Sequence, residues 1–200
     1  FLNGGKLVNP ILIDRIQDSE GKTIFNNEKR YCENCDLISF EGNSNPIIKN
    51  KYKQIFSPQT AYQITSMLKG VIERGTGKGL RDLKLELAGK TGTTNKNTDT
   101  WFIGFTSNLV VGVYIGYDNP RSLGKFETGS KTAMPVFKEF IEKTANTYNA
   151  RPFKVANNIK MMVIDAKTGQ KATPKTKITI IESFKTIDNR SNNLFNNIDS

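Results

Sequence analysis

Two long apolar runs lie in the middle of the chain. Residues 101–105 and 109–117 are apolar almost throughout, and a short polar turn separates them. Runs of this length, bounded by turn residues, are typical of buried β-strands. A further strand is predicted over residues 85–94, directly upstream. Because both runs are apolar on both faces, we expect helices to cover their sheet on each side, with Trp101 and Phe102 in the core.

Two amphipathic helices are predicted around this sheet. Ser57 and Pro58 suit the N-cap and the first helical position, and Gly75 suits the end of the same helix. A second helix is predicted over residues 132–144. Each has apolar residues three and four positions apart on one face. They are Ala61, Ile64, Leu68, Val71 and Ile72 in the first helix, and Ala133, Val136, Phe137, Phe140 and Ile141 in the second.

The N-terminal part of the chain is more polar. A strand is predicted over residues 11–16, with a turn at residues 18–22 and a returning strand at residues 23–25. Residues 26–53 are polar and rich in Asn, and they are expected to form a long irregular insertion on the surface.

The C-terminal part has the pattern of a strand pair, over residues 160–165 and 178–184. The sequence therefore predicts an α+β protein whose mostly antiparallel sheet is flanked by helices. We expect residues 1–150 to form this part, with the polar insertion inside it, residues 151–185 to form a small β extension, and residues 186–200 to be a disordered tail.

Charge and composition narrow the possible functions. The 200 residues carry a net charge of +10, which favours nucleic acid, an anionic membrane surface or a carboxylate-rich glycopeptide as partner. The Lys and Arg residues are scattered without interleaved aromatics, a pattern more typical of a solvated surface than of a nucleic-acid interface. Histidine is absent, which excludes Ser-His-Asp catalysis, Cys-His catalysis and His-based metal sites within this chain. We expect no metal and no cofactor.

The candidate chemistry lies at residues 90–94, Lys-Thr-Gly-Thr-Thr. A peptide lying antiparallel along this strand edge would pair with its backbone, and Gly92, which has no Cβ, would let it approach closely. Lys90 would attract a terminal carboxylate, to which Thr91 and Thr93 offer hydroxyl groups. The strand alternation places Lys90 and the two Thr side chains on opposite faces, so they share a site only at the edge.

A Lys-Thr-Gly triplet on a strand that two hydrophobic strands follow resembles the third active-site motif of penicillin-binding proteins and β-lactamases. The surrounding sequences narrow the resemblance: Arg-Gly-Thr-Gly at 74–77, Ala-Gly-Lys-Thr-Gly-Thr-Thr-Asn at 88–95 and Gly-Lys-Phe-Glu-Thr-Gly at 124–129. Together they resemble the transpeptidase domain of bifunctional class A penicillin-binding proteins. The likeness extends over about residues 1–145, and more loosely to about residue 184.

This resemblance implies a serine D,D-transpeptidase that cross-links peptidoglycan. It implies that Lys90 and the backbone N–H of Thr93, as an oxyanion donor, are catalytic, and that Thr91, Gly92, Thr93 and Thr94 bind substrate. The implied partners are peptidoglycan stem peptides, their lipid-linked precursor, β-lactam antibiotics and the remainder of a parent polypeptide, without nucleic acid. The family also implies a location at the periplasmic face of the bacterial inner membrane, and a glycosyltransferase domain and membrane anchor elsewhere in the parent.

Family members also need a Ser-x-x-Lys nucleophile motif and a Ser-x-Asn motif upstream of Lys-Thr-Gly. Residues 66–69, 19–22 and 122–125 match the first pattern, and residues 191–193 match the second. The first match is expected on the solvated face of a helix, the second lies in a turn, and the others come after Lys90. The nucleophile is therefore expected outside this chain, which begins with Phe1 and is interpreted as a C-terminal piece that is inactive alone.

Three other hypotheses are weaker. Cys32 and Cys35 form a lone C-x-x-C that cannot complete a four-ligand zinc site without His, so a local loop disulfide is the favoured state in an oxidising compartment. A P-loop is not supported, because Lys84 stands where that motif needs glycine. The alternative function is a non-catalytic basic module for nucleic acid or an anionic surface, for which nucleic-acid retention with a steep salt dependence would be diagnostic.

Overall fold

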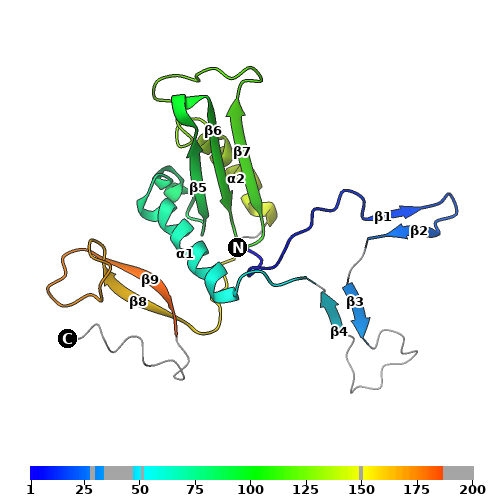
Figure 1. Cartoon of the computed structure of the whole chain (residues 1–200), viewed down its shortest axis with the longest axis horizontal. Helices are drawn as coiled ribbons and strands as arrows, with labels where there is room; N and C mark the ends of the chain where they lie inside the picture. The colour runs from blue at the N-terminus through cyan, green and yellow to red at the C-terminus, as the bar shows by residue number, and fades with distance from the viewer. Residues whose placement is uncertain (28–29, 34–46, 51, 149–150, 187–200) are drawn as a thin grey trace. The chain divides into compact units, whose positions relative to one another are not determined.

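The computed structural model describes residues 1–27, 30–33, 47–50, 52–148 and 151–186. The chain divides into two compact units, one formed by Lys6–Ile55 and the other by Phe1–Gly5 together with Phe56–Ser200. The elements of the larger unit are α1 (Pro58–Arg74), the 3-10 helix η1 (Lys78–Leu83), β5 (Ala88–Thr93), the 3-10 turn η2 (Asn95–Asn97), β6 (Asp99–Phe105), β7 (Val110–Gly116), α2 (Ala133–Tyr148), β8 (Ile159–Asp165) and β9 (Thr179–Lys185) (Figure 1).

The predicted central sheet is confirmed. Its strand order is β5-β6-β7, and both pairings are antiparallel. The buried apolar cluster beside this sheet contains residues from several elements: α1, η1, β6, α2 and the segment just before β5. The members of this cluster are Ile72, Leu80, Leu87, Phe102, Ala133, Phe137 and Ile141. The antiparallel sheet with its helices confirms the α+β fold class.

α2 covers one face of the sheet. The Phe102 and Phe137 rings are fully buried, with centroids 4.8 Å apart. Gly104 makes this approach possible, since a Cβ at that position would lie 2.6 Å from the Phe137 ring. Burial of each such ring stabilises the fold by roughly 1.5–3 kcal/mol. On the predicted stripe of α2, Val136 and Phe140 stay 49% and 41% exposed, so only part of that stripe faces the core.

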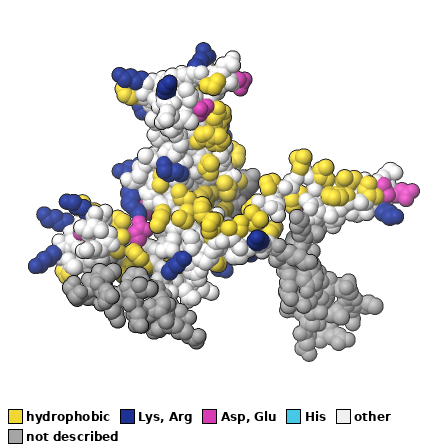
Figure 2. Space-filling model, viewed as in Figure 1, with side chains coloured by type: hydrophobic (Ala, Val, Ile, Leu, Met, Phe, Trp, Pro, Cys, Tyr) yellow, Lys and Arg dark blue, Asp and Glu magenta, His cyan; other side chains and the backbone are white. Residues whose placement is uncertain are grey.

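The opposite face of the sheet is largely open, so the expectation of helices on both sides is wrong. Trp101, Ile103 and Tyr114 are 42%, 48% and 49% exposed. Figure 2 shows hydrophobic side chains at the surface over this part of the molecule. The placement of Trp101 in the core is also wrong, whereas Phe102, its neighbour on the other face, is fully buried. Alternation along β6 separates the two aromatic residues.

α1 begins and ends as its sequence predicts. The Ser57 side chain accepts a hydrogen bond from Thr60 N, and Pro58 occupies the first turn. At the other end, Gly75 N donates to Val71 O at 3.0 Å. Gly75 has no room for a side chain, because a Cβ would lie 2.9 Å from the Val71 backbone.

β8 and β9 form a separate antiparallel hairpin, and the two strands predicted here are confirmed to within one residue. Polar contacts attach the hairpin to α1. Gln63 Nε2 donates to Ser183 O at 3.0 Å, and Lys185 Nζ donates to Thr60 Oγ1 at 2.7 Å. An ion pair between Arg74 and Glu182 adds to them.

The smaller unit contains two antiparallel strand pairs, β1 (Arg15–Gln17) with β2 (Thr23–Asn26), and β3 (Arg30–Glu33) with β4 (Ile47–Asn50). The strand predicted over residues 11–16 is wrong for its first four residues, because the partner strand β2 is only four residues long. The expectation of an irregular insertion is also wrong at β3 and β4.

Two predictions concern residues outside the described part of the chain. Cys32 lies in β3, but Cys35 and the tail from residue 187 are not among the described residues. The local disulfide and the disordered tail therefore stay predictions.

Candidate active site

The Lys-Thr-Gly triplet lies on β5, at one edge of the central sheet. Among the described strands, only β6 pairs with β5, so its outer edge has no strand partner. Lys90 pairs with Ile103 and Gly92 with Trp101 on the open face of the sheet. A strand with one free edge can add an extended peptide through backbone hydrogen bonds.

The Lys90 side chain bends around this free edge. Its Nζ donates to Thr91 O at 2.9 Å and lies 3.4 Å from Thr91 Oγ1. The ammonium group and the Thr91 hydroxyl therefore meet at the strand edge, although their side chains leave the strand on opposite faces. Within the described part of the chain, Lys90 makes no ion pair, so its positive charge is available to an anionic ligand.

The loop that follows α1 lies beside the same edge. Thr76 and Thr91 share a hydrogen bond between their hydroxyl oxygens, at 3.1 Å. Gly77 is buried, and a Cβ there would lie 2.6 Å from the Ile72 side chain. The sequence predicted only that Gly75 ends the helix, and the contact of Thr76 with Thr91 places this loop beside β5 as well. The hydroxyl groups of Thr76 and Thr91 and the ammonium group of Lys90 thus lie close together, beside the loop that follows the C-terminal end of α1.

Thr93 is held from the side opposite Lys90. Gly129 N donates to Thr93 Oγ1 at 3.1 Å, which ties the loop before α2 to β5. This loop packs tightly, since a Cβ on Gly129 would lie 2.3 Å from Trp101 O and 2.6 Å from Gly92 O. Glycine at 129 therefore allows this loop to lie directly against the backbone of β5 at Gly92. In the sequence, this loop was notable only for the Gly-Lys-Phe-Glu-Thr-Gly pattern at residues 124–129, which contributes to the family resemblance.

Beyond Thr93, a polar turn stabilises the end of β5. Thr94 N donates to Asp99 O at 3.0 Å, and Asp99 N donates to Thr94 Oγ1 at 2.9 Å. The Asp99 carboxylate accepts hydrogen bonds from Tyr114 OH at 2.7 Å and from Thr98 Oγ1 at 3.0 Å. These two bonds, followed by a weaker one from Thr94, hold the pKa of Asp99 below its ordinary value. The same contact with Asp99 raises the pKa of Tyr114.

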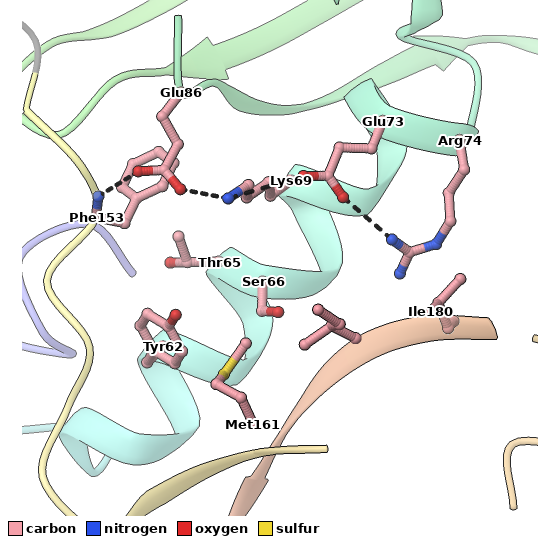
Figure 3. Close-up of a pocket in the computed structure, with 11 residues that line it drawn as sticks. Tyr62, Thr65, Ser66, Lys69, Glu73, Arg74, Glu86, Phe153, Met161 and Ile180 are labelled. Carbon is pink, nitrogen blue, oxygen red and sulfur yellow. Dashed lines mark hydrogen bonds and ion pairs between the residues drawn. The ribbon is translucent and has the colours of Figure 1, made fainter. Parts of the chain in front are cut away.

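A cavity of about 460 Å³ lies elsewhere in this unit, between α1 and the β8–β9 hairpin (Figure 3). Its lining includes none of residues 90–94. Ser66 and Lys69, the literal Ser-x-x-Lys match on α1, both line it. The expectation that this match lies on the solvated face of the helix is therefore wrong, since both side chains face this cavity.

Lys69 is unsuited to accept a proton from Ser66. It pairs with Glu86, and its Nζ lies 3.7 Å from Glu73 Oε1. Burial alone would lower the pKa of Lys69, but the hydrogen bond and charge of Glu86, with the charge of Glu73, raise it above its ordinary value. An activated serine needs a neighbouring base, which a stably protonated lysine is not. Glu86 also accepts a hydrogen bond from Phe153 N at 2.7 Å, which anchors the C-terminal segment.

Comparison with known proteins gives the family. The sequence model of the transpeptidase family, described as "Penicillin binding protein transpeptidase domain", matches residues 1–142. The chain belongs to the penicillin-binding protein transpeptidase family. The match contains the Lys-Thr-Gly strand and the loops that carry Thr76 and Gly129, and it ends within α2, before the β8–β9 hairpin.

Relatives of this penicillin-binding transpeptidase chain are proteins named Penicillin-binding protein 1A. The one from Rickettsia prowazekii is 42% identical over 185 residues, which are 92% of this chain and 23% of the relative. The one from Pseudomonas aeruginosa is 33% identical over 218 residues, covering 94% of this chain and 26% of the relative. The chain thus spans about a quarter of the length of the curated relatives that it matches.

A solved structure supports the same conclusion. The crystal structure of Penicillin-Binding Protein 1A from Haemophilus influenzae aligns with a TM-score of 0.70 at 26% identity, covering 94% of this chain and 31% of that one. In the described part of our family member, no helix is long and apolar enough to span a bilayer.

Proposed function

We propose that this chain is the C-terminal part of a serine D,D-transpeptidase domain that cross-links peptidoglycan. The observation that supports the proposal best is the free edge of β5, where Lys90 and the Thr91 hydroxyl meet beside the Arg-Gly-Thr-Gly loop. Such an edge suits an extended peptide that ends in a carboxylate, because the backbone can pair with the peptide and the ammonium group with its end.

The reaction begins with attack of a serine oxygen on the D-Ala-D-Ala carbonyl of a stem peptide. The peptide bond breaks, D-Ala leaves after its nitrogen takes up a proton, and an acyl-serine ester remains. An amine of a neighbouring strand then attacks the ester and forms the amide of the cross-link; the ester bond breaks, and the serine oxygen leaves and takes up the proton that the amine loses. β-Lactams would acylate the same serine through their strained amide.

Each residue of the β5 edge has a role in this proposal. Lys90 attracts the substrate carboxylate and raises the local positive potential during proton transfer. The backbone N–H of Thr93 donates to the developing oxyanion. Thr91, Gly92, Thr93 and Thr94 line the peptide. The hydrogen bond from Gly129 N to Thr93 Oγ1 leaves the Thr93 hydroxyl proton free to donate to a ligand.

The nucleophile in this proposal lies outside these residues. Ser66 is a poor candidate, because its neighbour Lys69 is engaged with Glu86 and because both line a cavity that excludes residues 90–94. The open face beside Lys90, where Trp101 and Ile103 are about half exposed, leaves space for a segment that brings in the serine. We therefore propose that the chain is inactive alone.

We propose the same wider setting that the resemblance implies. Residues 1–150 would belong to the transpeptidase domain and residues 151–185 to a small β extension. The parent polypeptide would also carry a glycosyltransferase domain, use a lipid-linked precursor and act at the periplasmic face of the inner membrane. This chain covers about a quarter of the relatives' length, and the proposal places those parts in the remainder.

Covalent labelling with fluorescent penicillin tests the proposal. The product of the complete reading frame that contains these residues should be labelled, and the isolated 200-residue chain should not. Lys90→Ala should slow labelling by roughly 100-fold, the size of effect expected when one preorganised charge or donor is removed. Lys171→Ala, which removes the same charge from the C-terminal hairpin, is the matched control and should be labelled normally.

Two results would overturn the proposal. One is the absence of penicillin labelling in the complete, folded product. The other is an equal labelling rate in Lys90→Ala and Lys171→Ala, which would show that the ammonium group at the β5 edge takes no part.

A further inference from the structure

Although Lys and Arg are scattered along the whole chain, few acidic residues accompany them in the segment that contains the β8–β9 hairpin. Residues 151–186 carry eight Lys or Arg and only two Asp or Glu, a net charge of +6, whereas the whole chain carries +10. Figure 2 shows Lys and Arg side chains gathered around the turn end of this hairpin. Charges of one sign on a small element repel one another, so an anion bound there relieves that repulsion.

The acidic residues of this segment are already engaged. Glu182 pairs with Arg74 on α1. The Asp165 carboxylate accepts hydrogen bonds from Lys167 N at 2.7 Å and from Thr168 N at 3.1 Å. Neither acid neutralises the lysines. None of the seven lysines makes an ion pair within the described residues, and the six other than Lys185, which donates to Thr60, also make no side-chain hydrogen bond there. These six are Lys154, Lys160, Lys167, Lys171, Lys175 and Lys177.

The turn that carries four of these lysines, residues 166–178, is held by internal backbone hydrogen bonds. Asp165 N donates to Gln170 O at 2.8 Å, and Ala172 N donates to Val163 O at 3.0 Å. Ala166 N donates to Ile178 O at 3.0 Å and closes the base of the turn. The lysines therefore project from an ordered scaffold, so little backbone entropy is lost when they bind a partner.

We propose that this basic turn is a second, non-catalytic binding surface for the carboxylate-bearing peptidoglycan strand, an inference that rests on the proposed function. Lysine presents a compact charge that pairs well with single carboxylates. Between Ala166 and Lys177 the other side chains are small or polar, chiefly Thr, Gly and Gln. Hydroxyl and amide groups suit a hydrated sugar-peptide polymer, with which they can exchange hydrogen bonds.

Two other polyanions fit this surface less well. Nucleic-acid binding surfaces combine basic groups with aromatic side chains for stacking and with Arg for phosphate, and the turn has neither aromatics nor Arg. An anionic bilayer surface favours elements that insert large apolar side chains among their basic residues. Ile178, at the end of the turn, is the one large aliphatic side chain between residues 166 and 178.

A cosedimentation experiment with purified peptidoglycan sacculi tests this proposal. It compares the complete reading-frame product with a variant carrying Lys167→Gln, Lys171→Gln, Lys175→Gln and Lys177→Gln. The control variant carries Lys22→Gln, Lys53→Gln, Lys78→Gln and Lys84→Gln, four exposed lysines outside the hairpin. At about 50 mM salt, where charges are weakly screened, the turn variant should bind sacculi at least about tenfold more weakly than the control variant.

Further measurements identify the ligand. Amidation of the sacculus carboxyl groups should remove the difference between the two variants, and raising the salt to about 500 mM should do the same. The proposal is overturned if the two variants bind unmodified sacculi equally, or if amidated sacculi preserve the difference. It is equally overturned if the turn substitutions weaken binding to phosphatidylglycerol vesicles or to a single-stranded oligonucleotide more than binding to sacculi.

Penicillin labelling separates this surface from the active site. The turn variant should be labelled at the rate of the control variant, because residues 166–178 are absent from β5 and its loops. Slower labelling of the turn variant would contradict a non-catalytic role. Loss of labelling in the unsubstituted protein would end the proposed function, whereas the comparison of the two variants on sacculi would still judge the binding surface.

Discussion

The two antiparallel sheets of the larger unit are held in place by different forces. The β5–β7 sheet is positioned by an apolar core in which Phe102 and Phe137 are completely buried. The β8–β9 hairpin has two residues below a tenth exposed, Ile164 and Ser183, and it meets α1 mainly through hydrogen bonds and an ion pair. The site strand therefore depends on packing, whereas the hairpin depends on polar contacts.

This difference shows how stability is distributed in the unit. Packing of a buried ring is lost all at once when the ring is removed, because the surrounding atoms cannot refill the space. Exposed polar contacts contribute little individually, because water competes for each of them. Substitutions in the core should thus unfold the site strand, whereas substitutions of the polar side chains that join α1 to the hairpin should loosen the hairpin while the sheet remains folded.

The largest effect is expected from the core of the β5–β7 sheet. Phe137→Ala should lower the free energy of unfolding by about 3–5 kcal/mol, since it leaves a cavity against Phe102. Phe140→Ala, on the same helix at a position 41% exposed, should cost less than about 1 kcal/mol and is the matched control. Urea denaturation followed by circular dichroism measures both, and equal losses would contradict the assignment of the core to one stripe of α2.

A smaller effect is expected where β5 meets the C-terminal segment. Glu86→Gln removes the charge that pairs with Lys69 and weakens the hydrogen bond from Phe153 N, so we expect a loss of about 1–3 kcal/mol. Hydrogen exchange should show faster exchange around Phe153 with little change in β6. Glu139→Gln, whose partner Lys143 is on the exposed face of α2, is the control. Faster exchange in β6 as well would show that the two sheets are not held independently.

Substitution of the N-cap of α1 should lower the free energy of unfolding somewhat less. Ser57→Ala removes the acceptor for Thr60 N and should cost about 1 kcal/mol. Because α1 contacts both β5 and β9, this loss should appear in the stability of the whole unit. Ser57→Asp, which keeps an acceptor at the N-cap, should restore most of the stability in thermal unfolding, and failure of that rescue would remove the capping explanation.

The smallest effect is expected at the exposed end of the site strand. The depressed pKa of Asp99 means that its contribution to stability is present above the unfolded-state pKa, near 4, and is lost as the pH falls through the lower folded-state value. Tyr114→Phe should raise the pKa of Asp99 toward its ordinary value, measured by NMR titration of the carboxyl carbon. The stability difference from the unsubstituted protein should shrink between pH 6 and about pH 2. An unchanged pKa of Asp99 would show that Tyr114 is not its main partner.

Local patterns predicted much of the fold. Ser57-Pro58 and Gly75 act within one or two turns of backbone, so the ends of α1 were predicted correctly. The apolar runs at 101–105 and 109–117, and the alternation at β8 and β9, placed the strands to within a few residues. The first part of the strand predicted at 11–16 was wrong because a strand needs a partner of matching length, and β2 is too short to supply it.

The surroundings of the candidate site were harder to predict. The contacts of Thr76 with Thr91 and of Gly129 with Thr93 join residues 15 and 36 positions apart. The glycine residues at 74–77 and 124–129 were the only hint in the sequence. They indicate that another segment of backbone packs closely there, but they do not indicate which segment it is. The exposure of Trp101 was missed because an apolar strand has the same composition whether a helix or nothing covers one of its faces.

The sequence by itself determined α1, α2, the strands of the larger unit, the Lys-Thr-Gly position and the family resemblance, because these depend on residue type and on spacing along the chain. Only the tertiary structure decided that Lys90 reaches the Thr91 hydroxyl around a free strand edge, that Lys69 forms an ion pair with Glu86, and that one face of the sheet stays open. These features arise from contacts between distant segments, whose free energy depends on how the elements pack and not on local propensity.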